Sequence, residues 1–159
     1  MAVKLDLEPS VLQQIAQQLG MILADMYVLY VKTQNFHWNI VDPRFYSLHK
    51  FLEEQYEALA EAIDEVAERI RILGQRSPGS LQQFLDMTSL HESDGDLSGD
   101  EMLHALLKDH QSLAQQLRDR IEYVSNLRDE GTADLLINRL RFHEKTAWMI
   151  RSHLINPLG

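Results

Sequence analysis

The chain has 159 residues and a formal net charge of −9, and this length favours one domain with a sizeable core. It contains no cysteine, so disulfides, thiolate metal sites and cysteine nucleophiles are excluded. A surface this acidic repels bare duplex DNA over most of its area and attracts cations.

The N-terminal half shows no pattern of export or membrane insertion. Lys4 is followed by Asp6 and Glu8 rather than by the apolar core of a secretory signal. The most apolar run, residues 19–31, is interrupted by Asp25 and is too short to span a bilayer. Together with the absence of cysteine, this predicts a cytoplasmic protein with no membrane contact.

Two long helices are predicted first along the chain. After Pro9-Ser10, apolar residues recur at helical spacing to about residue 37, and Asp42-Pro43 then breaks the pattern. A second periodic segment covers residues 45–73, and Gly74 follows it as a natural C-cap.

The second half of the chain predicts one short and two long helices. Residues 81–87 form a short helix inside a long connection. Ser98 and Glu101 have the spacing of a capping box, which predicts that a third long helix begins there. Gly131 separates it from a fourth long helix, residues 132–153.

Four long helices in a chain of this size predict an all-α four-helix bundle. The long link between the second and third long helices lets the chain cross the length of the bundle, so we expect an up-down-down-up order rather than a simple meander. We expect residues 1–159 to form a single domain, with residues 1–9 as a short N-terminal tail.

Histidines and carboxylates are the candidate metal ligands. His37 ends the first predicted helix, and His49 lies near the start of the second with Glu53 four residues later on the same face. Asp64 and Glu68, again four residues apart, share a face further along that helix. Imidazole nitrogen together with carboxylate oxygen suits iron, zinc or manganese.

Helix geometry separates these residues into two groups. His49 and Asp64 are fifteen residues apart on one helix, or about 22 Å at a rise of ~1.5 Å per residue. They cannot bind the same ion within one subunit. Either they belong to unrelated features, or an antiparallel two-fold pairing of second helices brings them together across a dimer, in two equivalent sites.

Plainer interpretations are available for the same residues. The acidic positions of the second helix also fit a solvated helix face. The sequence Glu101-Met102-Leu103-His104 matches half of a bundle-core di-iron motif, but no second copy exists, and we interpret the match as chance.

Four motifs resemble the Dps family of ferritin-like proteins, the DNA-protection-during-starvation proteins or mini-ferritins. They are Gln34-Asn35-Phe36-His37-Trp38-Asn39, Leu48-His49-Lys50-Phe51, Asp64–Gly74 and Glu144–Ser152. The resemblance covers nearly the whole chain, and the motifs are specific in combination.

The resemblance implies a ferritin-like fold, two-fold dimers assembled into a hollow homo-dodecamer, and a ferroxidase and iron-storage function. Such proteins oxidise ferrous iron, usually preferring hydrogen peroxide, store ferric mineral and thereby limit oxidative damage. The implied ferroxidase ligands are His37 and His49 of one subunit with Asp64 and Glu68 of its neighbour, and Glu53 matches a position near the second metal.

Further roles follow from the resemblance. Trp38 adjoins the site as a possible electron donor, although packing is the plainer role. Asp129, Glu130 and Asp134 lie where the family has an acidic pore, although a solvated helix start explains them equally well. The first ten residues hold Lys4 as their one basic residue, so DNA binding is expected to be weak or absent.

Two other functions are open from the sequence: a structural cage with a metal-free site, and zinc or manganese handling without redox turnover. Five histidines have no assigned role and are expected mostly at the surface or as helix caps: His91, His104, His110, His143 and His153.

Overall fold

The computed structural model describes residues 5–154, which fold into four long helices and one short one. They are α1 (Pro9–Asn39), α2 (Phe45–Ile72), α3 (Leu81–Met87), α4 (Gly99–Asn126) and α5 (Glu130–His153). Within the described residues there is no strand, which confirms the predicted all-α bundle.

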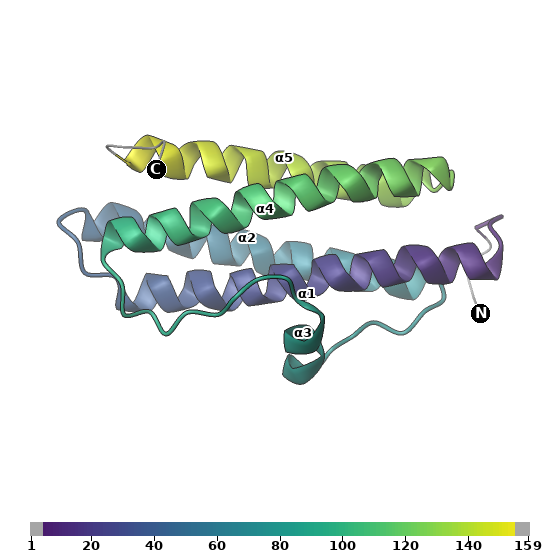
Figure 1. Ribbon diagram of the computed structural model, residues 1–159, viewed down its shortest axis with the longest axis horizontal. Coiled ribbons are helices and arrows are strands. Elements are labelled where there is room, and N and C mark those ends of the chain that lie inside the picture. Colours follow the sequence, from purple (N-terminus) through teal and green to yellow (C-terminus); the bar gives the residue numbers. More distant parts are fainter. Residues whose placement is uncertain (1–4, 155–159) are drawn as a thin grey trace.

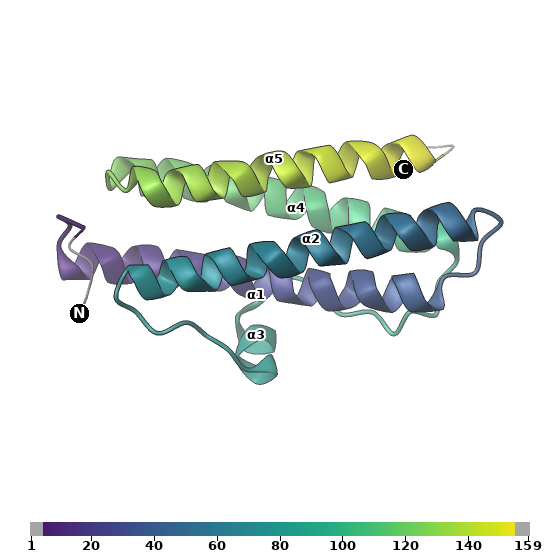
Figure 2. The same cartoon turned by 180° about the vertical axis from the view of Figure 1, so that it is seen from behind.

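The helices pair as two antiparallel hairpins, α1 with α2 and α4 with α5 (Figure 1). The hairpins pack together through α1 against α4 and α2 against α5. Because the connection carrying α3 crosses the length of the bundle, α2 and α4 run in the same direction, as Figure 2 also shows from behind. The predicted up-down-down-up order is confirmed.

An apolar core fills the space between the four long helices. Leu19, Leu23 and Leu29 of α1 are buried against residues such as Leu52 of α2 and Leu106 of α4. Each leucine buried in this way stabilises the fold by roughly 1.5–3 kcal/mol relative to exposure. Because this core sets how α1 and α2 are rotated about their axes, it also sets which of their side chains meet where the two helices are joined.

Helix ends follow the capping signals of the sequence. The Ser98 hydroxyl accepts a hydrogen bond from the Glu101 amide at 3.2 Å, and Glu101 accepts one from the Ser98 amide at 2.7 Å, which confirms the predicted capping box. Gly74 has a φ of 82°, and its amide donates to Arg71, which confirms the C-cap of α2.

Two predicted boundaries were wrong by about two residues. Helix α1 continues to Asn39, beyond its last periodic apolar residue. Helix α5 begins at Glu130 rather than Thr132, because the Asp129 side chain caps it by accepting from the Thr132 amide at 3.1 Å. Arg128 takes a left-handed φ of 65° to turn the chain into this cap.

The ends of the chain lie partly outside the described residues. Of the expected tail, residues 1–4 lie outside them, whereas Leu5 and Leu7 pack against the edge of the core. No described helix is long and apolar enough to cross a membrane.

Candidate metal centre

The α1–α2 corner brings His37 and His49 together. His37 lies in the last turns of α1 and His49 in the second turn of α2, and residues 40–44 reverse the chain between them. The two imidazole rings are stacked, with centroids 3.8 Å apart and planes 11° apart. His37 is 6% exposed, and His49 is half-buried.

Reciprocal hydrogen bonds set the tautomer of both histidines. The Nδ1 of His37 donates to the His49 carbonyl at 2.7 Å, and the Nδ1 of His49 donates to the His37 carbonyl at 2.8 Å. Because a carbonyl oxygen only accepts, each Nδ1 carries the ring proton. Each Nε2 therefore has its lone pair available, as a metal ligand requires.

Aromatic rings hold the pair in place. Phe45 stacks on His49 at 4.9 Å, and Tyr56 meets His37 edge-on at 5.2 Å. Tyr56 was missed by the sequence analysis, since its position in α2 carried no metal-ligand spacing. These contacts restrict the rotation of both imidazoles.

Glu53 adds an ionised carboxylate near the imidazoles. It accepts a hydrogen bond from the Lys50 ammonium at 2.9 Å, and this bond is the main reason that the pKa of Glu53 is lowered. His37 and His49, when protonated, lower the Glu53 pKa further. The carboxylate is thus close enough to the histidines to sense their charge.

Asp64 and Glu68 form a separate, exposed pair further along α2. A hydrogen bond and the negative charge from Asp64 raise the pKa of Glu68. Two carboxylates held this close repel one another, and a bound cation would relieve the repulsion. The structure does not bring this pair to the histidines: across residues 5–154, no three His, Asp or Glu side chains could hold one metal ion.

Known proteins resemble the chain over nearly its whole length. The ferritin-like domain family matches residues 16–156. A low temperature-induced protein of Nostoc sp. is 42% identical over 153 residues, covering 92% of this chain and 86% of that protein. The DNA protection during starvation protein 2 of Bacillus anthracis is 35% identical over 142 residues, covering 89% and 97%.

A solved structure of a related protein has the same fold. The crystal structure of a Dps protein from Vibrio cholerae O1 matches with a TM-score of 0.90 at 34% identity, covering 96% of each chain. This chain belongs to the Dps family. The ferritin-like bundle expected from the motifs is therefore confirmed.

Large apolar side chains of this Dps-family chain are exposed at the α1–α2 corner. Trp38 is 65% exposed, so most of its ring does not pack within one chain. Phe45 and Tyr46, in the first turn of α2, are also exposed. Exposed apolar side chains therefore lie on both helices of this corner, and one of them, Phe45, stacks on His49.

The three acids expected at a Dps pore differ in their surroundings. Asp129 is 6% exposed and is fully engaged, since it caps α5 and pairs with Arg69 at 2.8 Å. Glu130 and Asp134 are exposed. Asp134 lines a groove of about 300 Å³ that it shares with Glu68.

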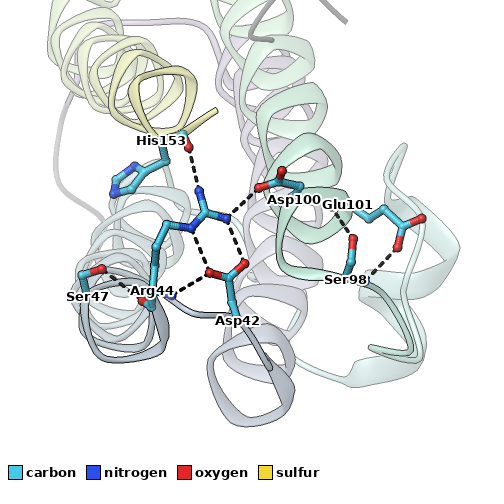
Figure 3. Close-up of polar contacts among 7 residues, drawn as sticks. All are labelled: Asp42, Arg44, Ser47, Ser98, Asp100, Glu101 and His153. Carbon is cyan, nitrogen blue, oxygen red and sulfur yellow. Dashed lines mark hydrogen bonds and ion pairs between the residues drawn. The ribbon is translucent and has the colours of Figure 1, made fainter. Parts of the chain in front are cut away.

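A polar cluster around Arg44 links the α1–α2 corner to the rest of the bundle (Figure 3). The sequence did not predict this cluster. The guanidinium donates to both Asp42 oxygens at 2.8 Å, to Asp100 of α4 at 2.7 Å and to the His153 carbonyl of α5 at 2.7 Å. The Arg44 hydrogen bonds lower the pKa of Asp42 to about 2. One side chain thus joins the α1–α2 loop to two other helices.

The expectation for the remaining histidines was wrong for His110 and His143. Both are fully buried between α4 and α5, and their Nδ1 atoms share a hydrogen bond of 2.8 Å. Burial lowers the pKa of His110 to about 3 and that of His143 well below its usual value. His153 acts as expected near a helix end, donating from Nδ1 to the Met149 carbonyl.

Proposed function

We propose that this Dps-family chain oxidises ferrous iron, preferably with hydrogen peroxide, at sites shared between two subunits of a homo-dodecamer that stores the ferric product. The observation that carries the proposal is the His37–His49 pair, whose Nε2 lone pairs are free while no third ligand from residues 5–154 joins them.

A second copy of the chain supplies what one subunit lacks. Asp64 lies about 22 Å along α2 from His49, and Glu68 about 28 Å, at ~1.5 Å per residue. An antiparallel two-fold pairing of α2 helices reverses this offset, so that the acids of each subunit meet the histidines of the other. The exposed apolar surface of Trp38, Phe45 and Tyr46 would be covered by the same pairing.

The ligand types suit ferrous iron as a substrate. Imidazole and carboxylate bind iron(II), and zinc or manganese can take the same ligands without turnover. The related Vibrio cholerae protein is described as a member of a superfamily of ferritin-like diiron-carboxylate proteins. We assign the second ion to Glu53, because the pKa of its carboxylate is lowered and the histidines contribute to that shift.

The reaction balances with two ferrous ions and one peroxide. Each ferrous ion gives one electron, hydrogen peroxide takes both with two protons, and two ferric ions and two waters result. Because the peroxide is fully reduced in one site, no hydroxyl radical is released. This accounts for protection against oxidative damage.

Acidic side chains provide a route for the incoming cation. Glu130 and Asp134 are exposed, and Asp134 shares a groove with Glu68. Carboxylates at such a position concentrate cations. Asp129 is left out of this proposal because its carboxylate is occupied by Arg69 and by the start of α5.

The test is peroxide-driven iron oxidation by the assembled protein, followed by ferric absorbance. The double variant His49→Ala/Asp64→Ala should lose roughly 10–100-fold or more in rate, since both halves of the site lose a ligand. The matched control is His91→Ala/Glu54→Ala, which removes an exposed histidine and an exposed acid outside the site. Equal rates in the two double variants would end the proposal.

A further inference from the structure

A row of aromatic rings leads from the histidine pair into the middle of the subunit. Tyr56 meets His37 at 5.2 Å, Tyr30 meets Tyr56 at 6.0 Å and Tyr27 meets Tyr30 at 5.7 Å, all edge-to-face. Phe84 of α3 stacks on Tyr27 at 4.5 Å and closes the row. The three tyrosines are half-buried.

Helix geometry makes the row continuous. Tyr27 and Tyr30 are one turn apart on α1, and His37 lies two turns beyond Tyr30 on the same face. Tyr56 projects from α2 between Tyr30 and His37, so that it contacts both. The row covers ten residues of α1, or about 15 Å at ~1.5 Å per residue.

Packing alone does not require tyrosine in this row. Edge-to-face ring pairs contribute about 0.5–1.5 kcal/mol each, and phenylalanine would make the same contacts. What tyrosine adds is a phenol, which can give up one electron together with its proton. Three such rings in contact with one another, starting at an iron-binding imidazole, form a path for that electron.

We propose that Tyr56, Tyr30 and Tyr27 form a relay that supplies one electron to the iron site and moves the resulting radical to Tyr27, beneath α3. The inference rests on the proposed peroxide-driven oxidation of iron. It applies when peroxide meets a site that holds a single ferrous ion and therefore lacks the second electron.

The electron count of this step is complete. Hydrogen peroxide takes one electron from the ferrous ion and one from Tyr56, which also gives up its phenol proton. With one further proton from solvent, the products are one ferric ion, two waters and a tyrosyl radical. Tyr30 then transfers its phenol hydrogen to Tyr56, and Tyr27 transfers its own to Tyr30, so only Tyr27 remains oxidised.

The relay protects the metal ligands. Without it, the missing electron would be taken from a group beside the iron, such as an imidazole or the adjacent Trp38. With it, the oxidised group lies about 15 Å along α1 from His37, at ~1.5 Å per residue. A half-loaded site then completes peroxide reduction without damage to its own ligands.

Freeze-quenched electron paramagnetic resonance on the assembled protein tests the relay. Each site receives one ferrous ion under anaerobic conditions, followed by one equivalent of hydrogen peroxide, in protein with natural or ring-deuterated tyrosine. The wild type should give a radical whose spectrum narrows on tyrosine deuteration. Tyr56→Phe should lose this signal and gain oxidised Trp38 and His37 by mass spectrometry.

Two further variants locate the end of the path. Tyr27→Phe should keep a tyrosyl signal, on Tyr30, with changed hyperfine splitting. The control Tyr123→Phe, whose ring lies on α4 outside the row, should match the wild type. Each substitution keeps the ring, so folding is preserved.

Failure of the relay is distinct from failure of the proposed function, because ferric absorbance is read in the same samples. If ferric ion forms but Tyr56→Phe keeps the full tyrosyl signal, or tyrosine deuteration leaves the wild-type spectrum unchanged, the relay is wrong. If the wild type forms no ferric ion with peroxide, the proposed function fails and the relay with it.

Discussion

At the scale of single residues, the fixed tautomer of His37 and His49 matters most. Each ring donates from Nδ1 to the backbone carbonyl of the other residue, so the two Nε2 atoms are left free for the proposed metal. The sequence predicted the pair from residue types and spacing. It could not predict the reciprocal bonds, because they depend on how residues 40–44 close the α1–α2 corner.

The buried pair His110 and His143 is a feature that the sequence did not predict. A helical pattern does not distinguish a histidine that faces the core from one that faces solvent when both have apolar neighbours in the sequence. The structure buries the pair, and each histidine satisfies the other with one hydrogen bond. Acidification lowers the stability of the fold, because a neutral imidazole in the core cannot take up a proton that the unfolded chain accepts.

The buried histidines make the stability of the fold depend on pH. The folded pKa of His110 is about 3, below the ordinary value of 6.5, so stability is complete above pH 6.5 and falls as the pH drops toward 3. Between pH 6.5 and 5 the loss should be about 2 kcal/mol for this histidine, at ~1.36 kcal/mol per pH unit. His143 acts in the same direction.

Urea unfolding at pH 7 and pH 5 measures this loss. The variant His110→Leu/His143→Leu removes both partners of the hydrogen bond, so no polar group is left alone. It should lose less stability than the wild type between the two pH values. A variant that loses as much as the wild type would show that other groups set the acid sensitivity.

At the scale of helices, capping signals predicted boundaries better than periodicity did. The predicted Ser98–Glu101 capping box sets the start of α4, and Gly74 follows the end of α2 as predicted. The start of α5 was missed because it depends on a left-handed Arg128 and on an aspartate held by Arg69 of α2. That contact joins residues distant in sequence, so no local pattern reveals it.

The cap of α4 provides a direct test at this scale. Ser98→Ala removes the acceptor for the Glu101 amide and should cost about 1 kcal/mol of unfolding free energy. Ser98→Gly should cost only about a few tenths of a kcal/mol. Urea unfolding of both variants compares them, and an alanine variant as stable as the wild type would contradict the assigned cap.

The Arg44 cluster is the second feature at this scale, because it joins three segments beside the histidines. Arg44→Met should destabilise the fold by about 1–2 kcal/mol, a value reduced because the guanidinium is partly open to solvent. It should also slow iron oxidation, since the loop between His37 and His49 loses its anchor.

Arg71→Met is the control for this change. Arg71 is exposed and donates to the Gln75 carbonyl just beyond the end of α2, so its loss should change stability by less than about 0.5 kcal/mol. If the two methionine variants unfold at the same urea concentration, Arg44 does not act as an anchor.

At the scale of the whole molecule, charge limits what the assembled protein binds. The net charge is −9, and the first ten residues contain Lys4 as their one basic residue. Several phosphate contacts are needed for tight binding of duplex DNA. We expect no gel shift of linear duplex at nanomolar protein and physiological salt, and a clear shift under those conditions would refute this expectation.

The distance between the two ligand groups is the other property of the whole molecule. The histidines and the Asp64–Glu68 pair were predicted from the sequence to be too far apart to meet in one subunit, and no complete metal site occurs within residues 5–154. The surface of a second copy that would complete the proposed site depends on assembly, and neither helical periodicity nor the structure of one chain gives that surface.

Complementation between two inactive variants measures the sharing of sites most directly. His49→Ala and Asp64→Ala subunits are dissociated, mixed in equal amounts and reassembled, and peroxide-driven iron oxidation is compared with that of each variant alone. Half of the dimers should be mixed, and each mixed dimer should have one intact site of two, so the rate should recover to about a quarter of the wild type. If the mixture is no more active than the separate variants, the site is not shared between subunits.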